Sequence, residues 1–176
     1  ASVHDTNPWI ATLFDLIRHI YAQGIPMFGA CFGHQAIAMA LGGKVGPNPN
    51  GWVFGLTHSE ILHKTTWMQG MPKTLKQYGA HIEQVTILPE NAVMLSANEA
   101  CLNTGFHIAG TVYTTQNHPE MTPEFMAALV AEYAKKLPTD VAKAAQSSLT
   151  EGADTEAYAE SIARFFQSAK IPLSHV

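Results

Sequence analysis

One cysteine stands in a local pattern that could make it a nucleophile. Cys31 is the centre of Gly29-Ala30-Cys31-Phe32-Gly33, which has the form G-x-C-x-G. The apolar run Ile25–Ala30 before it predicts a buried strand, and a helical apolar pattern follows it. A nucleophile at such a turn is held in a strained backbone conformation, and the flanking glycines are expected to remove clashes. The dipole and free N–H groups of the following helix favour a thiolate and stabilise an oxyanion.

A second pattern far along the chain could supply a base for that thiol. Gln116-Asn117-His118-Pro119-Glu120 follows the strand-like run GTVYTTQ. Residues two apart in an extended chain point to the same side, and Pro119 biases His118 towards an extended conformation. We therefore expect His118 and Glu120 to face one site, with the imidazole as base and the carboxylate fixing its tautomer.

Each pattern taken alone also suits an inert interpretation. Cys31 could be a small buried hydrophobic residue beside two glycines that allow helix packing. The His118–Glu120 stretch could be an ordinary surface turn. Cys101 has no glycine pattern and no helix start near it, so we interpret it as a bystander thiol. His34 is interpreted as a packing residue behind the nucleophile.

The elements that must position these residues begin with a helix. Asn7 is a good N-cap, Pro8 occupies the first helical position, and apolar residues recur at helical spacing up to Tyr21. Residues 44–55 are interpreted as a surface loop, residues 67–80 as irregular, and residues 144–154 as polar and flexible. Further strands are expected over Leu56–Leu62, Gln84–Leu88, Ala92–Ala97 and Gly110–Thr115. Further helices are expected from Pro123 to Pro138 and around residues 154–169, and the whole alternation argues for a parallel sheet covered by helices.

Composition excludes several classes of protein. The 176 residues are 47% hydrophobic and 14% charged, with a formal net charge of −4, so no basic surface for nucleic acid is expected. No apolar run approaches the length that spans a bilayer, so no membrane partner is expected. Two cysteines cannot make a disulfide framework, which favours a cytoplasmic location. The nine histidines show no H-E-x-x-H spacing, so we expect no metal site.

Taken together, the two patterns are similar to those of a known family. The stretch GACFGHQAIAMALGGKVGPNPNGWVFGL followed by QNHPE resembles the class I glutamine amidotransferases, in particular the stand-alone guanylate-synthase-like members. This resemblance implies a three-layer αβα sandwich with a flavodoxin-like, doubly wound sheet. It assigns Cys31 as nucleophile, His118 and Glu120 as the rest of the triad, and the N–H of Phe32 as one oxyanion donor. Gln35 would help to hold the amino-acid end of the substrate.

The chain departs from the family pattern at two places. Family members usually show H-x-D-x-V before the later strands, whereas this chain has Glu83 in the third position of the motif that starts at His81. Family chains also carry βα units before the point that matches Ala1. We therefore expect residues 1–137 to form an N-terminally incomplete amidotransferase domain with an incomplete oxyanion hole, and residues 138–176 to form a helical extension packed on it.

The expected reaction is hydrolysis of the γ-amide of glutamine through a γ-glutamyl thioester, without metal or organic cofactor. A synthetase partner could accept the ammonia. Alternatively, the leaving group is a larger amine and the enzyme is a γ-glutamyl peptidase or hydrolase. Two further alternatives are a cysteine-elbow protein of stress response with a similar fold, and a catalytically silent module for assembly or regulation.

Overall fold

The computed structural model describes residues 1–169, in which helices and strands alternate at the start and strands dominate the middle. The first elements are α1 (Pro8–Ala22), β1 (Met27–Ala30), α2 (Phe32–Ala40) and β2 (Lys44–Pro47). The middle comprises β3 (Val53–Ile61), η1 (Thr66–Met68), β4 (Thr74–His81), β5 (Glu83–Ile87), β6 (Val93–Ala97), β7 (Gly105–Ile108) and β8 (Val112–Thr115). The chain continues with α3 (Pro123–Tyr133), α4 (Thr139–Ser148) and α5 (Thr155–Ser168).

The main sheet is mixed and carries β1 at one end of its strand order. That order is β1-β8-β7-β6-β3-β4, in which β1 and β8 are parallel and the other neighbours are antiparallel. The expected sheet is therefore present, but only one of its neighbouring pairs in the described residues runs in parallel. The long β3–β4 pairing makes the far end of the sheet a two-stranded ribbon.

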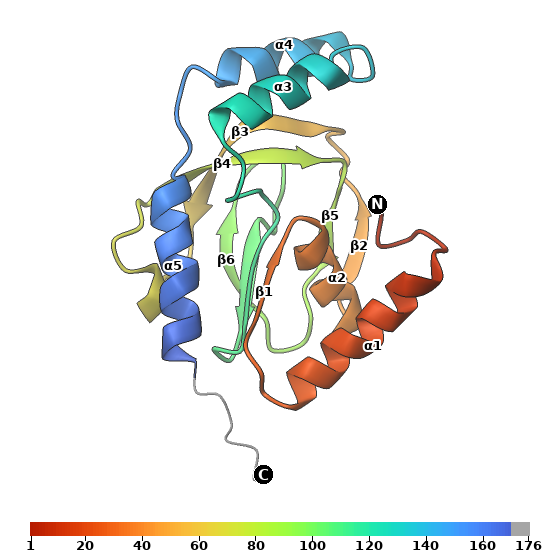
Figure 1. Cartoon of the computed structure of the whole chain (residues 1–176), viewed down its shortest axis with the longest axis vertical. Coiled ribbons are helices and arrows are strands. Elements are labelled where there is room, and N and C mark those ends of the chain that lie inside the picture. Colours follow the sequence, from red (N-terminus) through yellow and green to blue (C-terminus); the bar gives the residue numbers. More distant parts are fainter. Residues whose placement is uncertain (170–176) are drawn as a thin grey trace.

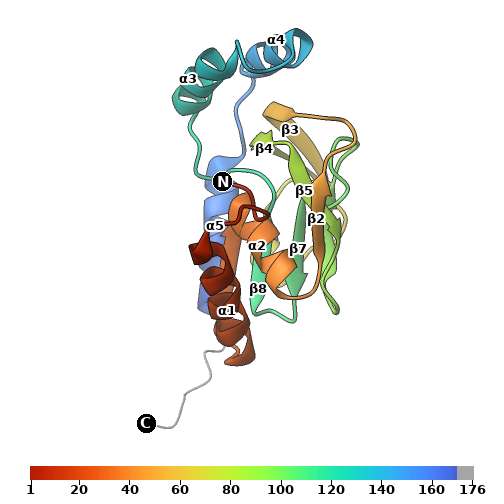
Figure 2. The same ribbon diagram turned by 90° about the vertical axis from the view of Figure 1, so that its right-hand side faces the viewer.

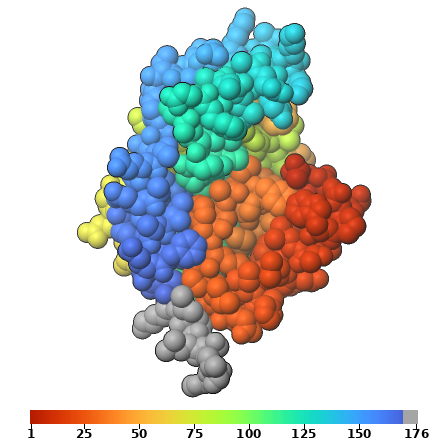
Figure 3. Space-filling view, viewed as in Figure 1, coloured from red at the N-terminus to blue at the C-terminus, as the bar shows by residue number. Residues whose placement is uncertain are grey.

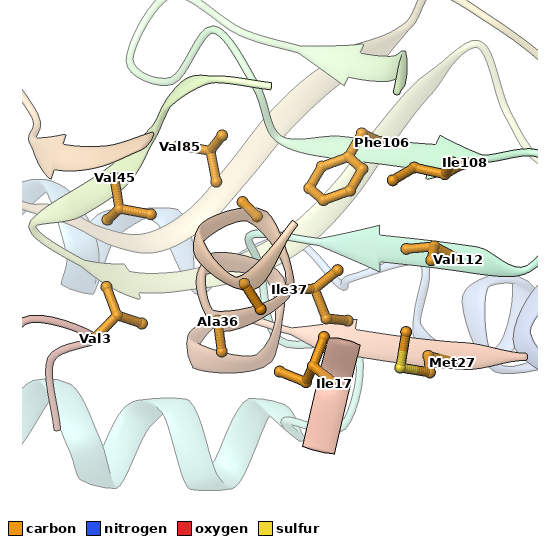
Figure 4. Packing of buried hydrophobic residues seen from close by; sticks show 12 residues of the cluster. Val3, Ile17, Met27, Ala36, Ile37, Val45, Val85, Phe106, Ile108 and Val112 are labelled. Atoms are coloured by element: carbon orange, nitrogen blue, oxygen red, sulfur yellow. The ribbon is translucent and has the colours of Figure 1, made fainter. Parts of the chain in front are cut away.

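Helices cover both faces of the sheet where β1 and β8 lie. Met27 and Val112 belong to one apolar cluster that also includes residues of α1 and α2, such as Ile37 (Figure 4). Alternate residues of the same strands point the other way, because successive side chains of a strand face opposite sides. Phe28 and Tyr113 accordingly pack with α5, and Figure 1 shows β1 between α5 on one side and α2 and α1 on the other.

The remaining helices lie at the ribbon end of the sheet. α4 contacts β3, and Figure 2 shows α3 and α4 together beyond the end where β3 and β4 are labelled. In the view of Figure 3, α3 (teal) lies above the orange surface formed by the segment that includes β1 and α2. β2 and β5 form a separate antiparallel pair whose Val45 and Val85 pack against α2. Within residues 1–169 no helix combines the length and apolarity that crossing a bilayer requires.

Several elements differ from the sequence-based expectation. The predicted loop 44–55 contains β2 and the start of β3, and the predicted irregular region 67–80 contains most of β4. Both strands carry glycine and polar residues, and their pairing with β5 and β3 overrides that weak local preference. The expected flexible stretch 144–154 includes the second half of α4, whose one buried residue, Ala145, gives little periodic signal. β7 was not expected, and residues 170–176 of the predicted extension lie outside the described residues.

Candidate active site

Cys31 occupies a strained backbone position between β1 and α2. Its φ of 46° and ψ of −102° are unusual for a residue with a side chain, and such a conformation costs on the order of 1–3 kcal/mol. The strain is held in place from both sides. The N–H of Cys31 donates to the carbonyl of Thr115 at 2.9 Å, and its carbonyl accepts from the N–H of Gln35 at 3.1 Å. The sulfur therefore sits at the N-terminus of α2, as the G-x-C-x-G pattern predicts.

Close packing requires glycine at only one of the two glycine positions of that pattern. A Cβ on Gly29 would lie 2.7 Å from the backbone carbon of Gly33 and 2.7 Å from Cδ1 of Ile37, so α2 packs directly onto β1 at this point. A Cβ on Gly33 would meet nothing within 4 Å. The prediction that both glycines remove clashes is therefore wrong for Gly33, because its α-carbon faces open space.

Gly29→Ala is expected to destabilise the fold by about 1–3 kcal/mol, because the new methyl group overpacks the β1–α2 contact. The free energy of unfolding from urea denaturation measures this effect. Gly33→Ala is the matched control: it adds the same methyl group in open space within a helix, so stability should be unchanged or raised by up to about 1 kcal/mol. Equal losses in the two variants would contradict the assignment of the clash to Gly29.

His118 is positioned by the edge of β4 and by Glu120. Its backbone N–H donates to the carbonyl of Tyr78 at 2.9 Å, in an isolated antiparallel bridge. Its Nδ1 lies 2.7 Å from Oε1 of Glu120, so the carboxylate fixes the ring and leaves Nε2 as the second polar atom of the imidazole. The His118 side chain is 16% exposed and that of Glu120 is 63% exposed. The imidazole is thus enclosed, whereas the carboxylate that orients it meets solvent.

The imidazole of His118 is electrostatically prepared to carry a proton. Burial lowers its pKa, but hydrogen bonds and negative charge from Cys31 and Glu120 outweigh burial and raise the pKa to about 9. The pKa of Glu120 is lowered: partial burial opposes the shift, and the hydrogen bond to His118 outweighs it. The protonated form of His118 is therefore favoured at neutral pH.

Cys31 and His118 line one cavity of about 390 Å³, together with Phe32 and Gln35. The structure thus brings the sequence-predicted site residues together, with Glu120 behind His118. The cavity also includes His81 and Glu83, the two positions of the altered family motif. The hollow lies where α2, the β4–β5 turn and α3 come together.

Part of the wall of this cavity is aromatic and apolar. Trp52 and Phe54 lie 6.2 Å apart between ring centroids, and Phe54 lies 5.7 Å from Tyr133 of α3. Leu129 and Met121 complete this wall. Trp52 and Phe54 both border the pocket. Tyr133 and Leu129 lie four residues apart on α3, the helix that follows His118.

Two buried amides lie between Cys31 and the second sheet. Gln35 Nε2 donates to the carbonyl of Glu83 at 2.8 Å and to Oε1 of Gln116 at 3.1 Å. Gln116 is fully buried, and its Nε2 lies 3.8 Å from the sulfur of Cys31. The role of Gln116 was not predicted, although its place two residues before His118 puts it on the same strand end.

The other titratable groups singled out in the sequence lie elsewhere. His34 is fully buried against the Phe106 ring at 5.1 Å, and burial lowers its pKa to about 3, as a packing residue behind Cys31 would require. Cys101 is buried outside the cavity, and burial raises its pKa to about 11. A second cavity of about 440 Å³ shares Trp52 and Phe54 but contains no cysteine. Among the described residues no group of three His, Cys, Asp or Glu is arranged to hold a metal ion.

Comparison with known families and proteins agrees with this geometry. The family model described as glutamine amidotransferase class-I matches residues 4–133. One subunit of the glutamine-hydrolyzing GMP synthase from Thermococcus kodakarensis is 32% identical over 107 residues, which are 60% of this chain and 56% of that protein. Gamma-glutamyl peptidase 3 from Arabidopsis thaliana is 30% identical over 128 residues, which are 69% of this chain and 51% of that protein. The chain therefore spans about half the length of these curated relatives.

Solved structures show the same fold. A glutamine amidotransferase from Thermotoga maritima superposes with a TM-score of 0.77 at 23% identity, covering 96% of this chain and 75% of that one. A glutamine amidotransferase from Methylobacillus flagellatus gives a TM-score of 0.75 at 24% identity, covering 100% of this chain and 76% of that one. The prediction of a three-layer, flavodoxin-like α/β fold is confirmed.

Proposed function

The chain belongs to the class I glutamine amidotransferase family, and from this premise we propose that it hydrolyses the γ-amide of glutamine through a Cys31–His118–Glu120 triad. The observation that carries this proposal is the meeting of Cys31 and His118 in one cavity, with His118 held by Glu120 at 2.7 Å. A strained cysteine at a helix N-terminus, beside an oriented imidazole, supports nucleophilic catalysis on an acyl group.

In the first half of the reaction the thiolate of Cys31 attacks the γ-carbonyl carbon. The carbonyl π electrons move to oxygen, and the N–H of Phe32, at the start of α2, donates to that oxyanion. The tetrahedral intermediate collapses when the imidazolium of His118 gives its proton to the departing nitrogen. Ammonia leaves, and a γ-glutamyl thioester with Cys31 remains.

In the second half His118, now neutral, accepts a proton from a water molecule that attacks the thioester carbon. The C–S bond breaks, glutamate leaves, and the thiolate–imidazolium pair is restored. Gln35, beside Cys31 on α2, is proposed to hold the amino-acid end of the substrate. Its Oε1 is the amide atom that makes no hydrogen bond among the described residues, which makes it a suitable acceptor for the substrate ammonium.

The related GMP synthase protein suggests where the ammonia goes. That protein is by name one subunit of a glutamine-hydrolysing synthase. We propose by analogy that ammonia released by this chain is consumed by a synthetase on another polypeptide. Copurification of such a synthetase with the chain, and glutamine-dependent synthesis by the pair, would support this assignment.

Affinity labelling tests the proposed function directly. A glutamine analogue with an electrophilic carbon in place of the γ-amide should alkylate Cys31, and free glutamine should slow the labelling. Peptide mapping separates Cys31 from Cys101. Labelling that glutamine does not slow would point to a cysteine-elbow protein with a different substrate. The absence of labelling would point to a catalytically silent module and contradict the proposal.

Glu120→Gln is expected to reduce kcat for glutamine by about 10–100-fold, less than changes to Cys31 or His118. The amide can no longer stabilise the imidazolium, but the carboxylate it replaces is 63% exposed, so water already weakens its contribution. Steady-state kinetics of ammonia release measure the loss. Glu151→Gln is the matched control, because Glu151 pairs with His58 outside the cavity at 3.5 Å and should leave kcat unchanged. A loss as large as that of Cys31→Ala would mean that the carboxylate does more than orient the ring.

The aromatic wall favours a second candidate function. A free glutamine that loses ammonia presents no apolar group to Trp52, Phe54 and Tyr133. A larger apolar amine on the γ-glutamyl group would bury its surface against these rings. The relative named gamma-glutamyl peptidase 3 supports this alternative, in which the same triad cleaves a γ-glutamyl conjugate.

Phe54→Ala is expected to separate these two candidates. If the wall binds the leaving group, kcat/KM for γ-glutamyl-p-nitroanilide should fall by roughly 10–100-fold, the cost of one lost ring contact of about 1.5–3 kcal/mol. Hydrolysis of glutamine, which lacks the aromatic group, should change little. Phe125→Ala is the control, since Phe125 is 54% exposed and lies outside the cavity wall. Equal losses for both substrates would show that the wall shapes the site without choosing the leaving group.

A further inference from the structure

The amide of Gln116 connects the nucleophile to the residue proposed to bind substrate. Gln116 lies in the segment after β8, is fully buried, and makes one contact on each side of its amide. Its Oε1 accepts from Gln35 at 3.1 Å, and its Nε2 lies 3.8 Å from Sγ of Cys31, within the range of a hydrogen bond to sulfur. A polar side chain buried this completely needs hydrogen-bond partners. The partners of Gln116 are the amide of Gln35 and the sulfur of Cys31, both of which line the candidate active site.

The direction of this chain of hydrogen bonds follows from its first acceptor. The carbonyl of Glu83 can only accept, so the amide atom of Gln35 that faces it at 2.8 Å must be the NH₂ group. That nitrogen has two hydrogens, and the second reaches Gln116. The contacted atom of Gln116 must then be its oxygen, which turns the NH₂ group of Gln116 towards the sulfur. A flipped amide at either glutamine would place two donors or two acceptors face to face.

We propose that Gln116 stabilises the Cys31 thiolate by donating an N–H to its sulfur, and that Gln35 holds Gln116 in this orientation. The sulfur thereby gains a neutral donor in addition to the His118 imidazolium, in a site where burial strengthens hydrogen bonds. The same Gln35 is proposed to bind the amino-acid end of the substrate. The hydrogen-bonded pair of Gln35 and Gln116 would then connect a bound substrate to the sulfur of Cys31. The connection to bound substrate rests on the proposed function, whereas the contact with sulfur does not.

Other ionisable groups also face this region and set the background against which Gln116 acts. His118, with Glu120 behind it, approaches from the segment after β8, His81 from the end of β4, and Glu83 from β5. His34 lies on α2 behind the nucleophile and is kept neutral by burial, which lowers its pKa to about 3. A substitution at Gln116 leaves all five of these groups in place.

The test is the pH dependence of Cys31 alkylation by iodoacetamide, which needs no glutamine and no turnover. Gln116→Leu removes the donor, so alkylation near neutral pH should slow by roughly tenfold and the profile should move to higher pH, where the rates converge. Gln116→Glu keeps the shape and the acceptor for Gln35 but places a carboxylate beside the sulfur, so it should slow alkylation further. Mass spectrometry of the Cys31 peptide excludes any contribution from Cys101.

Gln77→Leu is the matched control, because Gln77 is also a buried glutamine but accepts from Thr115 at 3.2 Å and makes no contact with sulfur. Its alkylation profile should match that of the unmodified chain. If Gln116→Leu does not fold, the isosteric Gln116→Glu decides the question. A folded Gln116 variant with an unchanged profile, or the same shift in Gln77→Leu, would overturn the proposal.

Kinetics separate this proposal from the proposed function. If glutamine is hydrolysed, Gln116→Leu should lower kcat and raise KM together, whereas Gln116→Glu, which still holds Gln35, should lower kcat with little change in KM. A shifted alkylation profile in a chain without glutaminase activity would leave the sulfur contact established and the proposed function contradicted. An unshifted alkylation profile in a chain that hydrolyses glutamine would contradict the sulfur contact and leave the proposed function supported.

Discussion

Cys31→Ala is expected to lower the rate of glutamine hydrolysis by at least about 10⁴-fold, because no other group in the cavity can form the thioester. The structure predicts that the fold survives, since Cys31 is partly exposed and alanine lacks only its sulfur atom. Ammonia release under saturating glutamine measures the loss, and thermal unfolding followed by circular dichroism confirms the fold. The strained backbone at this position remains, so any change in stability should stay small.

Cys101→Ala is the matched control for the thiol. Cys101 is buried outside the cavity, so its replacement should cost stability through a small void but leave glutamine hydrolysis unchanged. If Cys31→Ala retained appreciable activity, or if Cys101→Ala abolished it, the assignment of the nucleophile would be wrong. The two variants together therefore test which of the two cysteines acts.

His118→Ala is expected to lower kcat by about 10³–10⁴-fold, because both the proton donor for ammonia and the base for water are lost. His58→Ala is the matched control: His58 also pairs with a carboxylate, at 3.5 Å from Glu151, but lies outside this cavity. Its replacement should leave kcat within about twofold of the unmodified chain. Activity that survived in His118→Ala would show that another group moves the proton.

The unmodified enzyme should lose activity as pH rises through about 9, the raised pKa of His118, because the neutral imidazole cannot protonate the leaving nitrogen. The contribution of His118 to the stability of the fold also falls as pH rises. The pKa of His118 is raised above its usual 6.5, so its protonation stabilises the fold below that value, and this contribution is lost as pH rises through about 9. A pH–rate profile without an alkaline limb would contradict the role of imidazolium as acid.

The turn between β1 and α2 at Cys31 could be predicted from the sequence because its signals are local. An apolar strand, a glycine pair around Cys31 and a helical pattern lie within about twenty residues of one another. The contact between His118 and Glu120 was predictable for a similar reason, since the two residues are only two positions apart. The chain there forms a turn, in which the N–H of Met121 donates to the carbonyl of His118 at 3.4 Å, and not the expected extended strand. The spacing of the residues does not show that the segments around Cys31 and His118 meet. The family resemblance predicted that they form one site.

The rest of the site depends on contacts between distant segments. The aromatic wall exists because the start of β3 packs against α3, about eighty residues later in the chain. The local sequence around Trp52 and Tyr133 contains no signal that predicts this contact. β4 was missed because Gly79 interrupts its pattern. A Cβ there would lie 3.0 Å from Thr57, so the glycine serves the close approach of β3 to β4 and does not mark an irregular segment. Gln116 was overlooked because its importance lies in the two partners of its amide.

The shortness of β1 has a consequence for how the protein would lose activity on heating. β1 is four residues long and, in the part of the chain that the structure describes, bonds to β8 on one side. A strand this short can open locally at a lower free-energy cost than unfolding of the whole chain, and opening of β1 would release the backbone conformation that holds Cys31. Inactivation on heating would therefore precede melting of the aromatic cluster around Tyr113 and Phe165, and substrate bound to the thiol would act as a thermal protectant.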